Sequence, residues 1–284
     1  MLKKIFIPIF ALELAAAAFL LLRSHNFALF TPKGQIAEVQ THLISLELIT
    51  GIVIAITVLF AAFLIITKYR EGGGANYEPE STNNPVKQII LWAIPTGVIL
   101  FLAGITWTAT HTLDPRKPII TSVKPITIQV ISLRWKWLFI YPEAGIASVN
   151  FVQFPVNTPI EFELTADSPM NSFWIPQLGG QIYAMPGMGT FTHLIASEVG
   201  DYSGSTAEMS GAGFAGMRFV ARASTAADFD NWVQIVQNLN NNLDLAEYNK
   251  LETPSENTPV SFYGSTQYYL YNEVMMKFTM PPHS

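Results

Sequence analysis

The side chains that most often perform chemistry are few in this sequence, and their spacing does not bring them together. The chain has no cysteine, which excludes thiolate metal sites, iron–sulfur clusters, cysteine nucleophiles and disulfides. Its histidines include no pair at the spacings that place two imidazoles on one strand or one helix face. They are His25, His42, His111, His193 and His283. His193 alternates with Phe191 and Ile195, which is typical of a core or edge histidine in a strand.

Motifs for nucleophilic or phosphate chemistry are also missing. The sequence has neither a GxSxG nucleophile elbow nor a glycine motif that would cradle a phosphate. Two carboxylates, Glu13 and Glu47, stand within apolar stretches, where an ionisable group is a functional candidate by default. Glu47 lies only about one helical turn inside its stretch, so we expect its carboxylate to reach back to the membrane surface.

One stretch has the composition of a site without obvious ligands. It is GDYSGSTAEMSGAGFAGM, residues Gly200 to Met217, here called the glycine-rich stretch. It is small and polar, yet apolar, strand-like sequence flanks it on both sides. Such a stretch is either an ordinary surface loop or the remainder of a site whose ligands have been replaced. The elements around it decide between the two.

The composition indicates a membrane protein. Of the 284 residues, 50% are hydrophobic and 13% are charged, and the mean hydropathy is +0.30. Soluble domains carry about 25% charged residues, so a large part of this chain is expected to lie in a bilayer. The formal net charge of −5 and the lack of any Lys/Arg cluster exclude a nucleic-acid partner.

Two stretches, Leu43 to Thr67 and Ile89 to Thr110, are long and apolar enough to cross a bilayer, which takes about 20 residues. They predict a transmembrane hairpin within residues 26–117. A buried helix pair of a soluble protein is disfavoured, because such helices rarely stay apolar on every side. Lys68 and Arg70 favour a cytoplasmic connecting loop, although three basic residues after the second span nearly balance them.

The first 25 residues leave two interpretations open. Lys3 and Lys4 followed by an apolar run fit a signal peptide. Glu13 interrupts that run and no clear cleavage site precedes Arg23, which fits an uncleaved membrane anchor and slightly favours it.

Beyond the hairpin, residues 118–224 read as a β-sandwich. Short alternating runs such as TPIEFELTA and GMRFVARA, separated by turns, predict an antiparallel sandwich of about 100 residues. The apolar phase shifts between Val130 and Ile131, and a β-bulge would explain the shift. Residues 225–284 begin with a helical apolar pattern and continue with many tyrosines, which predicts a short, helical, aromatic-rich extension used for packing.

These features occur in an order that resembles a known family. The hairpin is followed by RWKW, then by NSFWIPQLGGQIYAMPGM, then by the glycine-rich stretch. This order is similar to that of subunit II of the haem–copper terminal oxidases. The resemblance covers nearly the whole chain from about Thr31, and it implies that the sandwich is an all-β, cupredoxin-like Greek-key domain.

The resemblance also implies which positions would hold the binuclear copper centre of the cytochrome c oxidases in that family. Asn171 and Phe214 stand where the family has histidines, and Thr206 and Ser210 stand where it has two cysteines. Glu208 and Met217 are retained. Soft thiolate ligands are what such a centre needs, so the resemblance implies that this chain binds no metal and no other cofactor.

Losing the ligands while keeping their surroundings is typical of the quinol-oxidising branch. PKGQI, KPITIQVISLRWKWLFIYPEAGIASVN and the aromatic-rich extension resemble the ubiquinol oxidases of the cytochrome bo type. The resemblance implies a complex that oxidises ubiquinol, reduces oxygen to water and translocates protons. Haem groups and one copper are then expected in subunit I, and this chain is expected to be a non-catalytic, structural subunit.

The same resemblance implies the partners and the location. Subunit I, the other oxidase subunits and membrane lipid are expected as partners, and cytochrome c and nucleic acid are not. The expected location is the bacterial inner membrane, as a multi-pass protein with its C-terminal domain on the periplasmic or outer face. A membrane-tethered, cupredoxin-like scaffold or binding protein outside respiration is the alternative.

Two positions depart from the family pattern. His25 falls where members of this branch often carry a lipid-accepting cysteine, which excludes that anchor. Gln88 falls where the family tends to have a glutamate associated with a proton pathway into subunit I. An amide cannot carry a proton as a carboxylate does, so a proton-entry role for Gln88 stays open. The choice between ubiquinol and menaquinol stays open as well.

Overall fold

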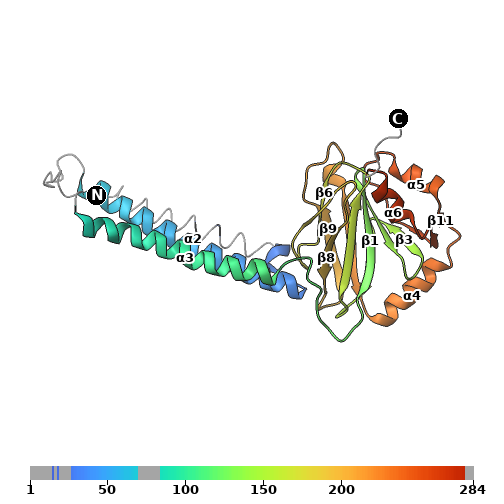
Figure 1. The fold of residues 1–284 in the computed structure, drawn as a ribbon, viewed down its shortest axis with the longest axis horizontal. Coiled ribbons are helices and arrows are strands. Elements are labelled where there is room, and N and C mark those ends of the chain that lie inside the picture. The colour runs from blue at the N-terminus through green and yellow to red at the C-terminus, as the bar shows by residue number, and fades with distance from the viewer. Residues whose placement is uncertain (1–14, 16–17, 19–26, 70–83, 279–284) are drawn as a thin grey trace. The chain divides into compact units, whose positions relative to one another are not determined.

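The structure is a computed structural model that describes residues 27–69 and 84–278, together with two isolated N-terminal positions (Figure 1). The expected signal or anchor segment and the hairpin loop therefore lie almost wholly outside the described residues. The chain divides into two compact units, one of residues 42–114 and the other of the residues before and after that range.

Two long helices account for the apolar stretches. Helix α2 spans Gln35–Lys68 and helix α3 spans Pro85–Thr112. Both are long and apolar enough to cross a membrane, and nothing in their most apolar windows is buried. A core helix of a soluble protein would be mostly buried, so this exposure favours contact with lipid or with other membrane subunits.

The helix boundaries have local causes. The Asn84 side chain caps α3 by accepting from the backbone N–H groups of Val86 and Lys87, and Pro85 occupies the first helical position. Helix α2 begins at Gln35, eight residues before the apolar run starts at Leu43. Its first turn is held against the sandwich, because the Ala37 N–H donates to the Leu178 carbonyl and the Ala37 side chain is buried.

The second unit is a sandwich of two sheets (Figure 1). Among the described residues one sheet has the order β12-β3-β2-β1-β5-β8 and the other the order β4-β10-β9-β6-β7. The strands of the first sheet are β1 (Ile126–Leu133), β2 (Lys136–Tyr141), β3 (Ile146–Val149), β5 (Ile160–Ala166), β8 (Thr190–Leu194) and β12 (Ser261–Tyr263). The strands of the second are β4 (Phe151–Pro155), β6 (Asn171–Trp174), β7 (Ile182–Ala184), β9 (Gly200–Thr206) and β10 (Arg218–Ser224).

The sandwich is mixed rather than wholly antiparallel. Strand β1 pairs parallel with β5, and β10 pairs parallel with β4, whereas the other pairs within the two sheets are antiparallel. The expectation of an antiparallel sandwich was therefore wrong for these two pairs. Alternating patterns predict strands, but they carry no information about the direction of the neighbour.

The inner core between the sheets is aromatic. Phe173 and Phe219 stack with ring centroids 5.1 Å apart, and Trp137 meets both rings edge-on. Phe219 lies opposite Gly204 on the neighbouring strand, and a Cβ on Gly204 would stand 2.1 Å from the Phe219 ring. Because Gly204 has no side chain, the Phe219 ring can occupy the space beside it.

The sandwich has a second core on the outside of the first sheet. Ile128 and Val130 face the inner core, whereas Ile131 and Leu133 face the second core. Strand β1 pairs without interruption with both neighbours across this point, so the predicted β-bulge was wrong. The apolar phase shifts because both faces of the strand are covered there, not because the backbone bulges.

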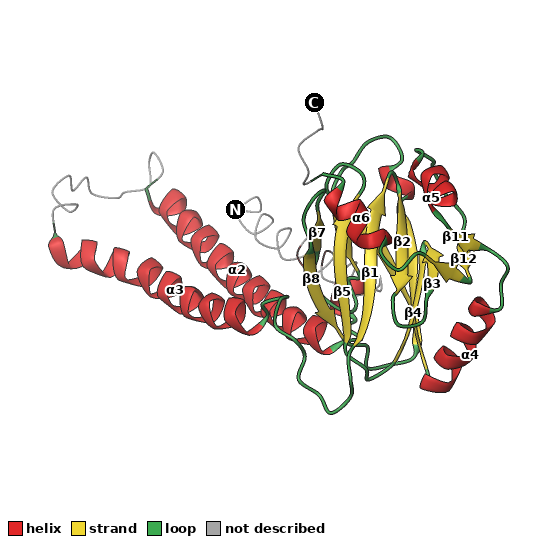
Figure 2. Cartoon of the chain, turned by 45° about the vertical axis from the view of Figure 1, so that its right-hand side comes forward, coloured by secondary structure: helices red, strands yellow, loops and turns green. Residues whose placement is uncertain are grey.

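The C-terminal extension supplies the cover. It contains α4 (Ala226–Gln237), β11 (Asn242–Leu243), α5 (Leu245–Glu252), β13 (Ser265–Thr266) and α6 (Leu270–Met276). Helix α6 lies across β1 and β5 (Figure 2). The buried apolar residues of the extension in this core are Leu243, Tyr248, Tyr263, Leu270, Tyr271 and Val274. The predicted packing role of the extension is confirmed by these contacts.

A buried lysine fastens the extension to the sheet. Lys136 of β2 is 2% exposed, and its ammonium donates to the carbonyls of Leu251 and Thr253, at 2.8 and 2.9 Å. These carbonyls end α5, where the helix leaves acceptors unsatisfied and favours a positive charge. Burial lowers the pKa of Lys136, and the two carbonyls give its ammonium the partners that a buried charge needs.

Gly204→Ala is expected to destabilise the sandwich by about 2 kcal/mol, because the new methyl group must displace the Phe219 ring in a filled core. Urea unfolding of the detergent-purified chain, followed by near-ultraviolet circular dichroism, measures the loss. Gly200→Ala in the same strand is the matched control, since its Cβ would meet no atom closer than 3.8 Å. Equal stability of the two variants would show that the core tolerates the methyl group.

Candidate functional site

The positions that the resemblance equates with copper ligands lie at one end of the second sheet. Asn171 is the first residue of β6, and Thr206 is the last residue of the adjacent strand β9. The remaining positions follow Thr206 in the loop that leads to β10, which contains the short 3-10 helix η3, Phe214–Gly216. The pairing of β6 with β9 is what brings the two segments together.

Asn171 is 1% exposed, and its side-chain amide is fully engaged. Its Nδ2 donates to the hydroxyls of Ser132 and Ser168, at 2.8 and 3.1 Å, and to the Pro169 carbonyl at 3.0 Å. Its Oδ1 accepts from the Thr206 hydroxyl at 3.3 Å. Two of the implied ligand positions are thus bonded to each other.

The other implied positions belong to the same loop. Thr206 Oγ1 approaches both the backbone N–H and the carbonyl of Glu208, at 3.4 and 3.3 Å. The Met217 carbonyl accepts from the Thr206 N–H at 3.3 Å, and the Met217 N–H donates to the Phe214 carbonyl at 3.1 Å. Met217 is buried in the inner core, and Phe214 is half-buried.

Packing against Trp135 explains the glycines of the loop. Trp135 lies in the turn between β1 and β2, and its Nε1 donates to the Ser210 carbonyl at 3.2 Å. A Cβ on Gly213 would stand 2.5 Å from the indole, and Gly211 has a φ of +119° beside the same ring. The glycine-rich stretch is therefore shaped by an aromatic side chain that lies over it.

A small cavity of about 160 Å³ remains between this loop and the β1–β2 turn. It is lined by Arg134, Trp135, Ser168, Pro169, Asn171 and Ser210. The Ser210 hydroxyl is buried without a hydrogen-bond partner in the part of the chain that the structure describes. Ser210 and Asn171 thus share one space, as two ligands of one centre would.

The donor set does not fit copper. Across residues 27–69 and 84–278, no three His, Cys, Asp or Glu side chains gather in a way that could hold a metal ion. At the implied positions stand an amide, two hydroxyls and a phenyl ring, with Glu208 and one thioether. The Asn171 amide is already hydrogen-bonded to neighbouring groups of the protein. Neutral oxygen donors of this kind do not replace bridging thiolates.

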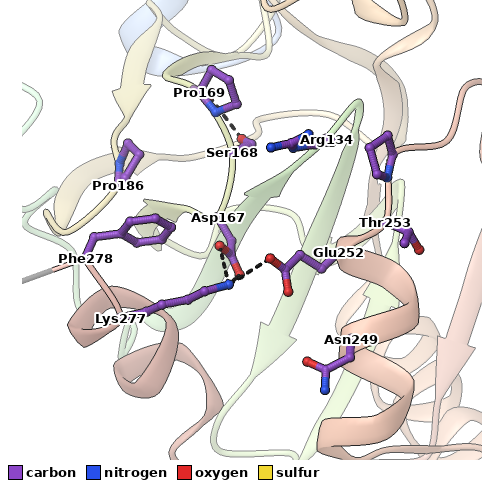
Figure 3. Close-up of a pocket in the computed structure, with 11 residues that line it drawn as sticks. Arg134, Asp167, Ser168, Pro169, Pro186, Asn249, Glu252, Thr253, Lys277 and Phe278 are labelled. Carbon is purple, nitrogen blue, oxygen red and sulfur yellow. Dashed lines mark hydrogen bonds and ion pairs between the residues drawn. The ribbon is translucent and has the colours of Figure 1, made fainter. Parts of the chain in front are cut away.

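A larger pocket of about 610 Å³ lies where the extension meets the sandwich (Figure 3). Lys277 bridges two carboxylates there, with its Nζ 3.0 Å from Asp167 and 2.8 Å from Glu252. The Tyr248 hydroxyl also donates to Asp167, at 2.7 Å. Burial opposes charge on Lys277, but the hydrogen bonds to Glu252 and Asp167 prevail and raise its pKa. Lys277 therefore stays positively charged at neutral pH, and its two ion pairs fasten the end of α6.

Sequence reasoning missed this cluster, because its members are scattered along the chain and no local pattern joins them. Asp167 and Lys277 are 110 residues apart. Asp167 directly follows β5, whose sequence IEFELTA already carries two glutamates, so one more acidic residue did not stand out.

The remaining predicted residues are separate from the loop. His193 is 7% exposed on the edge strand β8, and its Nδ1 is 3.0 Å from the Pro115 carbonyl. The prediction of a core or edge histidine is confirmed. Glu47 is exposed on α2, and Gln88 is exposed in the first turn of α3, both in the unit of residues 42–114.

Asn171→Asp is expected to cost about 3 kcal/mol of unfolding free energy near neutral pH, because a buried carboxylate replaces an amide whose NH2 group is surrounded by three acceptors. Burial raises the pKa of the new carboxyl above its unfolded value, so the penalty grows as the pH rises and is smaller at about pH 5 than at about pH 8. Chemical denaturation at the two pH values measures it.

Asn240→Asp, at an exposed position after α4, is the control for the change of charge. A loss in Asn171→Asp that is small, or equal at both pH values, would contradict the closed hydrogen-bond network.

Two family models match the part of the chain that follows the hairpin. The model of the cytochrome c oxidase subunit II periplasmic domain matches residues 144–224, and that of the COX aromatic rich motif matches residues 237–282. The crystal structure of the periplasmic domain of subunit II of cytochrome oxidase (CoxB) from Bradyrhizobium japonicum aligns with 26% identity and a TM-score of 0.38, over 41% of this chain and 96% of that one.

Other relatives align over most of this chain with higher sequence identity. Cytochrome bo(3) ubiquinol oxidase subunit 2 of Pseudomonas putida is 46% identical over 86% of this chain and 78% of that protein. Ubiquinol oxidase subunit 2 of Acetobacter aceti is 41% identical over 91% and 85%. Quinol oxidase subunit 2 of Bacillus subtilis is 35% identical over 90% and 80%. This chain therefore belongs to the family of haem–copper oxidase subunit II, in its ubiquinol oxidase branch.

Proposed function

We propose that this chain is a cofactor-free, structural subunit II of a proton-translocating haem–copper quinol oxidase, which couples quinol oxidation to the reduction of oxygen to water. The observation that carries the proposal is the closed network around Asn171 and Thr206, in a chain related to ubiquinol oxidase subunits. At two of the implied copper positions, Asn171 and Thr206, the side chains hydrogen-bond to each other.

The residues of the loop after β9 determine where electrons can enter the complex. Without thiolates at Thr206 and Ser210, this domain has no centre that could accept an electron from a soluble cytochrome c. Electrons then enter the complex from membrane quinol, and the haem groups and one copper lie in subunit I. Trp137 and Phe173 serve the core by packing against each other at 5.4 Å.

Each part of the chain takes a mechanical role in this proposal. Residues 26–117 form the membrane hairpin, whose exposed apolar helices pack against subunit I and lipid. Residues 118–224 form the cupredoxin-like domain on the periplasmic or outer face of the inner membrane. Residues 225–284 form the extension that closes the second core. Residues 1–25 remain a signal peptide or an anchor.

The test is purification of the complex through this chain from native membranes. We expect haem absorbance, one copper per complex and oxygen uptake driven by ubiquinol but not by cytochrome c. Comparing ubiquinol with menaquinol as donor identifies the quinol. A haem-free preparation would instead favour the membrane-tethered scaffold outside respiration, and two or more additional copper atoms would contradict the argument from the donor set.

Gln88→Glu tests whether the start of α3 takes part in proton entry. A carboxylate adds a group that can carry a proton where the amide cannot, so turnover is expected to stay equal or to rise, by up to about twofold. Oxygen uptake of the purified complex with ubiquinol measures it, with Gln88→Ala as the matched control. A large loss of activity in Gln88→Glu alone would count against a proton-entry role for this position.

A further inference from the structure

A short apolar turn just before α2 is ordered but exposed. The 3-10 helix η1, Ala28–Phe30, and the residue before it expose three large apolar side chains: Phe27 is 44%, Leu29 38% and Phe30 42% exposed. Single apolar residues on a protein surface are ordinary, whereas three within four residues are a local concentration of exposed apolar side chains.

Hydrogen bonds hold this turn in place at both ends. The Phe30 N–H donates to the Phe27 carbonyl at 2.9 Å, which closes the turn. The Thr41 hydroxyl of α2 lies 2.8 Å from both the Leu29 carbonyl and the Ala37 carbonyl, and shares its one hydrogen between them. The next residues are bound to the sandwich, because the Lys33 N–H donates to the Gln177 carbonyl and the Lys33 carbonyl accepts from the Ser197 N–H, each at 2.8 Å. The exposure is therefore a property of a fixed conformation.

The position of the turn along α2 indicates what covers it. Thr41 precedes by two residues the apolar run that begins at Leu43, a distance of about 3 Å along the helix axis. The Leu29 backbone, bonded to Thr41, thus lies level with the point where α2 changes from polar to apolar. Aromatic and aliphatic side chains at that level fit the boundary between lipid headgroups and acyl chains.

We propose that Phe27, Leu29 and Phe30 insert into the headgroup region of the bilayer and fix the depth at which α2 enters it. This inference rests on the proposed membrane location of α2.

The lack of cysteine in the chain permits a direct test in the intact oxidase complex. Phe30→Cys and, in parallel, Phe27→Cys are labelled with a fluorescent bimane in lipid nanodiscs. The wild-type complex provides the background from cysteines of other subunits. Met209→Cys, at a position 82% exposed in the glycine-rich stretch, is the water-exposed control, and Val58→Cys, in the middle of α2, is the membrane control. Haem absorbance and oxygen uptake show that each labelled complex is intact.

Lipids with a nitroxide near the headgroup are expected to quench the labels at Phe27 and Phe30 about threefold more than the label at Met209, which iodide in the water should quench instead. Labels at Phe27 and Phe30 that behave like the Met209 label would overturn the proposal. Protection from both quenchers would also overturn it, because the turn would then be covered by protein. Iodide quenching at Val58 would reject the membrane location itself, and this proposal with it.

Discussion

The burial of both faces of β1 and β2 is the constraint on which the rest of the sandwich depends. A sheet in the middle of a protein must be covered on each side, and here the inner cover is the second sheet, whereas the outer cover is the C-terminal extension. Without the extension, Ile131 and Leu133 would face water. The aromatic-rich segment is thus a structural layer of the domain.

Two polar contacts hold that layer in register, and each satisfies a buried charge, that of Lys136 in one and that of Asp167 in the other. Lys136 donates to the end of α5, and Lys277 joins Asp167 to Glu252 beside α6. A buried charge is tolerated only where its partners are supplied, so these contacts specify one position for the extension as well as stabilising it. Apolar contact alone would allow the helices to slide over the sheet.

The loop at the end of β6 and β9 has been closed by hydrogen bonds. In a metal centre, the bonds to the ion link the loops that supply the ligands. Removing the ligands would leave these segments without that link. Here the hydrogen bond between the Asn171 and Thr206 side chains links the two segments, and Trp135 packs over the glycines of the loop. The surroundings of the implied copper positions therefore persist as packing.

What the sequence determined by itself was local or compositional. The two apolar helices, α4 and the alternation of most strands follow from periodicity, and the lack of cysteine rejects a thiolate centre without any structure. The tertiary structure decided the parallel pairing of β1 with β5, the covered outer face that had suggested a bulge, and the start of α2 at Gln35. It also decided that Asn171 and Thr206, which the resemblance assigns to one centre, hydrogen-bond directly to each other across 35 residues of sequence. Periodicity reports which side of a segment is buried, but which distant segment buries it depends on the path of the whole chain.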